Sequence, residues 1–146
     1  MGGIFGLGNV LTEYKITDWL AGYFVPIAQR LSFNPLVLLV AVAIAMLALR
    51  FLDPSGFIAI AVLFVPIVDT TTAAGIPPLV LTAALLLASS PFWVTYQNIW
   101  VAMGDGIAAG QAFSAQERVR LANTYAVLAL ITLAAATGYW KLIGAL

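Results

Sequence analysis

The polar residues best suited to binding chemistry lie in two short interruptions of otherwise apolar sequence. The first interruption covers residues 50–56 (RFLDPSG) and the second covers residues 95–98 (TYQN). Hydroxyl, amide and carboxylate oxygens are hard ligands that suit a sodium ion, whereas amide and guanidinium groups donate hydrogen bonds to an anion. These residue types therefore predict reversible binding of a cation and an anion rather than a covalent reaction.

We predict that the two interruptions together supply one binding site. Short apolar segments broken by glycine, proline or polar residues indicate a site near the middle of the membrane in a secondary transporter. The expected substrate ligands are Arg50, Ser55, Thr95, Gln97 and Asn98, and the expected sodium ligands are Asp53, Ser55, Thr95 and Asn98.

Each of these assignments has a structural alternative. The sequence of residues 53–56 (DPSG) is also favourable for a tight turn. Arg50 lies three residues before Asp53, so the two side chains can instead form a local ion pair that neutralises both. The polar side chains of residues 95–98 can instead hydrogen-bond to neighbouring helices, as polar residues in membrane proteins often do. The residues alone leave both interpretations open.

The composition is that of an integral membrane protein and excludes several functions. The 146 residues are 63% hydrophobic and only 8% charged, with a mean hydropathy of +1.05, which excludes a water-soluble globular domain. His and Cys are absent, so no cofactor is expected besides a coupling sodium ion. Six basic and six acidic residues cancel without a basic run, so no nucleic-acid partner is expected. No nucleophile, base and orienting residue fall at a recognisable spacing, so no enzyme is expected.

The first interruption separates two apolar arms that are too short to cross a bilayer. The arm over residues 36–49 has fourteen residues and as a helix covers about 21 Å, less than the ~30 Å hydrocarbon core. One continuous span would place Arg50 and Asp53 at the membrane centre, where each charge costs at least ~2.5 kcal/mol. Residues 35–68 are therefore predicted to fold back as a re-entrant helical hairpin, with Pro35 at its first helical position.

The second interruption predicts a discontinuous transmembrane helix over residues 69–104. Residues 69–75 (DTTTAAG) are predicted to form a polar turn before the next apolar run. Pro91 lacks an amide proton and leaves an upstream carbonyl free, and residues 95–98 then break the apolar pattern. In hydrocarbon the freed backbone groups need buried polar side chains or a bound ion as partners. The aromatic residues nearby are expected to pack or to face lipid: Phe92, Trp93, Tyr96 and Trp100.

The N-terminal part of the chain, residues 1–34, is predicted to contain a helix end followed by an amphipathic interfacial helix. Thr17 is the expected N-cap of that helix, with Asp18 in its first turn. Trp19 and Tyr23 then fall at helical spacing beside polar positions, as in a helix that lies in the membrane interface. An ordinary helix end with a loop is the alternative for this segment.

The C-terminal part, residues 105–146, is predicted to hold a loop and the one conventional transmembrane helix. Residues 121–140 form a run of twenty residues without a charge, which is long enough to span. Ser114 and Glu117 have the spacing of a capping box at the start of this helix. Two arginines, Arg118 and Arg120, favour the cytoplasmic side for the preceding loop.

This order of elements resembles the C-terminal half of the divalent anion:sodium symporters, a family of the ion transporter superfamily. The similarity covers nearly the whole chain. It rests on residues 2–8 (GGIFGLG) followed by residues 18–20 (DWL), on residues 64–67 (FVPI), on residues 74–78 (AGIPP) and on residues 95–98 (TYQN). In that family the hairpin tip carries a Ser-Asn-Thr motif, where this sequence has residues 53–56 (DPSG). The family's second break often contains Thr-Pro-Pro-Asn, which this sequence matches at Thr95 and Asn98 but not at Tyr96 or Gln97.

The resemblance implies a function, partners and a location. A family member has two inverted halves and forms its site between them, so this chain is expected to be the C-terminal half of a sodium-coupled carrier of a dicarboxylate, another organic anion or a sulfate-like anion. The expected partners are the missing N-terminal half, a second copy of the complete protein in a homodimer, and the lipid bilayer. The expected location is the cell membrane, as a multi-pass protein. The alternative function is a structural small subunit of a larger membrane complex without transport of its own.

Overall fold

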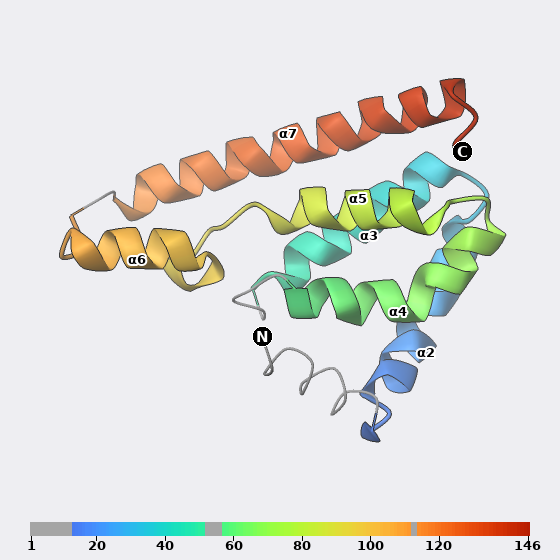
Figure 1. Ribbon diagram of the computed structural model, residues 1–146, viewed down its shortest axis with the longest axis horizontal. Coiled ribbons are helices and arrows are strands. Elements are labelled where there is room, and N and C mark those ends of the chain that lie inside the picture. The colour runs from blue at the N-terminus through green and yellow to red at the C-terminus, as the bar shows by residue number, and fades with distance from the viewer. Residues whose placement is uncertain (1–12, 52–56, 112–113) are drawn as a thin grey trace.

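The computed structural model describes residues 13–51, 57–111 and 114–146, and every regular element in these ranges is a helix (Figure 1). The predicted all-helical fold is therefore confirmed for the described residues. The elements, in chain order, are α2 (Ile16–Leu31), α3 (Pro35–Leu49), α4 (Phe57–Ala73), α5 (Pro78–Ser89), the 3₁₀ turn η1 (Thr95–Gln97), α6 (Ile99–Ile107) and α7 (Ala115–Leu142).

The α3 helix begins where the sequence predicts. Asn34 has an extended backbone and its Oδ1 accepts a hydrogen bond from the Leu36 amide at 3.0 Å, while Pro35 occupies the first helical position. The fifteen residues of α3 are all apolar, so the helix can be buried on every face. Its most deeply buried side chains are Leu38, Leu39 and Met46, which belong to the main hydrophobic core.

The α4 helix is longer than the sequence predicts. Residues 69–73 continue the helix instead of forming a turn, so the expected polar turn over residues 69–75 is wrong for most of its length. The hydroxyls of Thr71 and Thr72 donate to the Val68 carbonyl at 3.0 and 2.7 Å, which lets these polar residues remain in a helix. The turn comes at Gly75, whose φ of 82° suits glycine.

The α3 and α4 helices form a helical hairpin. They run in opposite directions, and the start of α3 and the end of α4 lie at the same end of the molecule (Figure 1). The α5 helix begins at that end as well and packs against both helices of the hairpin. Leu63 and Ile67 of α4 and Leu81 and Leu85 of α5 are fully buried in the shared core.

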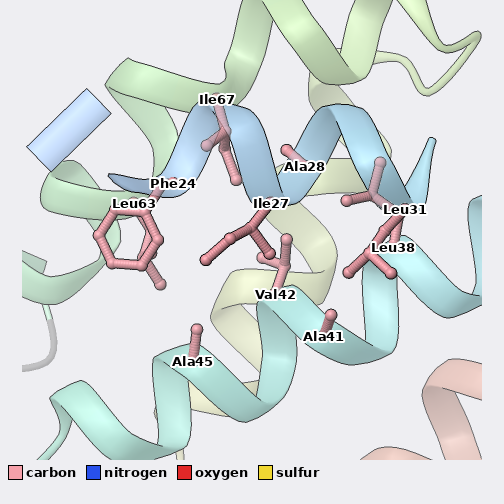
Figure 2. A pocket seen from close by; sticks show the side chains of 10 residues that line it. All are labelled: Phe24, Ile27, Ala28, Leu31, Leu38, Ala41, Val42, Ala45, Leu63 and Ile67. Carbon is pink, nitrogen blue, oxygen red and sulfur yellow. The ribbon is translucent and has the colours of Figure 1, made fainter. Parts of the chain in front are cut away.

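The α2 helix crosses one end of the hairpin. Side chains from α2, α3 and α4 surround a small cavity lined almost entirely by carbon (Figure 2). The helix begins at Ile16 after Lys15, so the prediction that Thr17 is its N-cap is wrong by two residues. The rings of Trp19 and Tyr23 meet edge to face with centroids 4.9 Å apart, and both side chains are exposed.

The α7 helix lies along one side of the molecule and packs on α3 and α5 (Figure 1). Within the described part of the chain, it is the one helix whose length and composition allow it to cross a membrane. Its capping box is confirmed, because the Ser114 amide donates to Glu117 Oε2 at 2.8 Å and the Glu117 amide donates to Ser114 Oγ at 3.2 Å. Its buried face holds Leu133 and four small residues, Ala122, Ala126, Ala129 and Thr137.

Candidate functional site

The helical structure between α5 and α6 is interrupted where the sequence predicts a break, and we call residues 90–98 the break. The α5 helix ends at Ser89, residues 90–94 have no helical structure, and η1 leads into α6, which starts at Ile99. In Figure 1 the thin connection between the two helices lies beside the end of α3. Backbone groups that would bond along a continuous helix therefore need other partners here.

Gln97 supplies several of those partners. Its side chain is buried, with 1% of its surface exposed. Its Oε1 accepts hydrogen bonds from the amides of Trp93 at 2.5 Å and Val94 at 2.9 Å. A single side chain thus satisfies two amides that the break removes from helical pairing, and it fixes the shape of residues 93–97.

Gln97 also joins the break to the end of α3. Its Nε2 donates to the Arg50 carbonyl at 2.8 Å, and Arg50 Nη2 donates to the Gln97 carbonyl. Arg50 is 2% exposed, so its guanidinium is held inside the protein. Burial of a charged group requires such polar partners, because desolvation otherwise costs more than the interactions return. The two interruptions of the sequence therefore meet at Arg50 and Gln97.

Aromatic contacts flank the junction, by which we mean the contact between Arg50 at the end of α3 and Gln97 in the break. The Tyr96 hydroxyl donates to the Phe51 carbonyl at 2.5 Å. The rings of Phe51 and Trp93 are stacked, with centroids 5.2 Å apart and planes inclined by 24°. These contacts again connect the end of α3 with the break, so the junction contains both polar and apolar parts.

The start of α7 is attached to the same region. Trp93 Nε1 donates to Asn123 Oδ1 at 2.8 Å, and Arg118 Nε donates to the Trp93 carbonyl at 3.1 Å. Sequence reasoning missed Asn123 and assigned Arg118 only to membrane topology. It expected Trp93 to pack or to face lipid. The ring does pack on Phe51, but the hydrogen bonds that join Trp93 to the start of α7 were not expected. The one feature of the sequence that could have indicated these contacts is the position of an aromatic residue, Trp93, beside the polar residues 95–98.

The other predicted ligands are placed as follows. Asn98 caps α6, because its Oδ1 accepts from the amides of Trp100 at 3.0 Å and Val101 at 3.3 Å. Thr95 is partly buried, and its hydroxyl makes no hydrogen bond to any described residue. Asp53 and Ser55 lie outside the described residues, so the structure does not place them.

The junction offers two kinds of chemistry. Arg50 brings a buried positive charge, and Thr95 brings a neutral hydroxyl that can accept from or donate to a ligand. Gln97 and Asn98 already use their side-chain carbonyl oxygens within the protein.

Comparison of the chain with protein-family models, with curated proteins and with solved structures gave no match.

Proposed function

We propose that this chain is the C-terminal half of a sodium-coupled secondary transporter for an anion. The observation that carries the proposal is the meeting of two helix interruptions at Arg50 and Gln97, inside an apolar helical chain. Irregular backbone at membrane depth is tolerated only where protein covers it or where it lines a water-filled cavity. Carriers build their binding sites from such interrupted helices near the middle of the membrane.

The helix lengths support a site at that depth. The fifteen residues of α3 and the twelve of α5 are too few to cross the bilayer, since they rise about 22 Å and 18 Å against a ~30 Å core. Both helices run from the same end of the molecule toward the junction (Figure 1). In the proposed transporter, α3 and α4 form a re-entrant hairpin, and α5 and α6 form a discontinuous transmembrane helix.

The charge of the junction supports an anionic substrate. The buried Arg50 guanidinium is positive, and the amino-terminal end of α6 adds a favourable dipole. The substrate class is a dicarboxylate, another organic anion or a sulfate-like anion. Oxygen atoms of Asp53, Ser55 and Thr95 are the proposed sodium ligands, and sodium would bind before the anion. Asn98, which the sequence also suggests as a sodium ligand, uses its Oδ1 to cap α6. The complete carrier would contain an N-terminal half and form a homodimer in the cell membrane.

Reconstitution tests this proposal. The chain is incorporated into liposomes together with the N-terminal half that the proposed carrier contains, and uptake of radiolabelled succinate and sulfate is measured with an inward sodium gradient. We expect accumulation that stops when the gradient is dissipated, and lower uptake for Thr95→Ala. Thr124→Ala is the matched control, because the Thr124 hydroxyl donates to the Arg120 carbonyl on the exposed face of α7. Equal uptake with and without the gradient would rule out sodium coupling.

One observation favours the second candidate, a structural subunit of a larger membrane complex. The side chains of Gln97 and Asn98 are engaged by the protein itself, as expected of residues whose purpose is packing. The two functions differ in their response to ligands. Stabilisation of the reconstituted protein against heat by sodium together with an anion would favour the carrier, because a ligand that binds only the folded state raises its stability.

A further inference from the structure

We propose that Arg50 and Gln97 act as positioning residues that clamp the break to the end of α3, and that Thr95 is the residue of the break left to contact a ligand. The clamp follows from the contacts of these residues. The ligand role of Thr95 rests on the proposed transport function.

The first step concerns the hydrogen-bonding capacity of Gln97. An amide side chain offers two acceptor positions and two donor hydrogens. Both acceptor positions of Gln97 are used by the amides of Trp93 and Val94, and one donor is used by the Arg50 carbonyl. A ligand could replace these contacts only by leaving buried backbone groups unpaired, which is costly. Gln97 is therefore suited to holding the break together rather than to binding solute.

The second step concerns the carbonyl that receives Arg50. In a continuous helix the Gln97 carbonyl would accept from the Val101 amide, four residues later. That amide instead donates to Asn98 Oδ1, because Asn98 is extended, with φ −144° and ψ 112°, and caps α6. The Gln97 carbonyl is thus released from helical pairing and accepts from Arg50 Nη2. The break creates the acceptor that the buried arginine requires.

The third step concerns Thr95. Its neighbours on both sides are anchored, since Trp93 and Val94 bond to Gln97 Oε1 and the Tyr96 hydroxyl bonds to the Phe51 carbonyl. Among the polar side chains of residues 93–98, only the Thr95 hydroxyl lacks a hydrogen bond to the described part of the protein. The clamp therefore fixes the backbone around one hydroxyl that is still available.

A cysteine reporter tests both parts. The chain contains no Cys, so Thr95→Cys provides a single thiol whose labelling by N-ethylmaleimide can be followed in the protein reconstituted in liposomes. We expect Gln97→Ala and Arg50→Ala each to accelerate labelling about tenfold. The first removes three hydrogen bonds between the Gln97 side chain and backbone groups, the second removes the charge-assisted bond to the Gln97 carbonyl, and either loss favours local opening by about that factor. The double variant should label no faster than the faster single variant, since the two residues act as one unit.

Matched controls and conservative variants complete the design. Gln29→Ala and Arg120→Ala remove exposed side chains of the same types and should leave the labelling rate unchanged. Arg50→Lys keeps a donor and should restore part of the slow labelling. If an alanine variant loses its helical circular dichroism signal, Arg50→Lys and Gln97→Glu take its place in the comparison. Equal labelling in all backgrounds, or independent effects of the two residues, would overturn the clamp.

Ligand protection separates the clamp from transport. In the Thr95→Cys variant, reconstituted together with the N-terminal half that the proposed carrier contains, sodium sulfate or sodium succinate should slow labelling of the cysteine at position 95. Adding Gln97→Ala should raise the concentration needed for protection. Protection by none of these salts, with clamp-dependent labelling still present, would overturn the ligand role of Thr95 and count against the proposed carrier. The clamp itself would then stand without the transport function.

Discussion

Arg50 and Gln97 lie 47 residues apart in the sequence, yet each donates a hydrogen bond to the backbone carbonyl of the other. Both side chains are almost completely buried. The exchange joins the end of α3 to the interruption between α5 and α6, and the stacked rings of Phe51 and Trp93 lie beside it. Two polar residues that the sequence suggests are substrate ligands thus connect two elements of the fold.

The contact between Tyr96 and Phe51 should contribute measurably to stability. Tyr96→Phe removes the hydroxyl that donates to the Phe51 carbonyl and keeps the ring. We expect a loss of about 1 kcal/mol, the usual net value of such a bond, and a Tm lower by about 4 °C in detergent. Tyr125→Phe is the control, because Tyr125 is 44% exposed, close to the 47% of Tyr96. An equal fall in Tm for both variants would contradict this prediction.

Two leucines of α5 should differ sharply in their contribution to packing. Leu81 is fully buried, whereas Leu79 is 80% exposed. Leu81→Ala leaves a cavity in the core and should cost about 2–5 kcal/mol of unfolding free energy. Leu79→Ala should change it by no more than about 0.5 kcal/mol. Chemical denaturation of the two variants measures the difference, and similar costs would show that α5 packs through another face.

The re-entrant hairpin can be tested by the side from which cysteines react. Single cysteines replace Phe33, just before α3, and Ala73, at the end of α4, and both positions are exposed. An impermeant maleimide should label both from the same side of sealed vesicles. Cysteines at Val119 and Leu142, near opposite ends of α7, serve as the reference and should label from opposite sides. Labelling of positions 33 and 73 from opposite sides would exclude a hairpin.

The start of α7 depends on its capping box. Ser114→Ala removes the oxygen that accepts from the Glu117 amide. We expect a loss of about 1 kcal/mol, typical of an N-cap replaced by alanine. Ser114→Asn, which restores an acceptor suited to the cap, should recover most of the stability in thermal unfolding. A stability of Ser114→Ala equal to that of the unchanged protein would mean that the cap is dispensable here.

Local signals in the sequence determined where α3 and α7 begin and where the apolar pattern breaks. Asn34 with Pro35 and Ser114 with Glu117 act within four residues, through a side chain that meets a nearby amide, so their effect is readable without the fold. The long uncharged run within α7 likewise follows from composition alone. At the threonine-rich end of α4, the prediction of a polar turn was wrong. The hydroxyls of Thr71 and Thr72 donate to a carbonyl within the helix, so these residues continue the helix instead of ending it.

The tertiary structure alone decided what the polar residues of the two interruptions contact. Nothing near Arg50 in the sequence indicates that its guanidinium meets the Gln97 carbonyl, since that contact exists only when α3 and α5 pack side by side. The packing of α7 on α3 and α5 likewise brings Asn123 of α7 to the ring nitrogen of Trp93. Residue type can predict that a buried polar group must have a partner, but the partner is chosen by the arrangement of helices, because it lies in a different element of the chain.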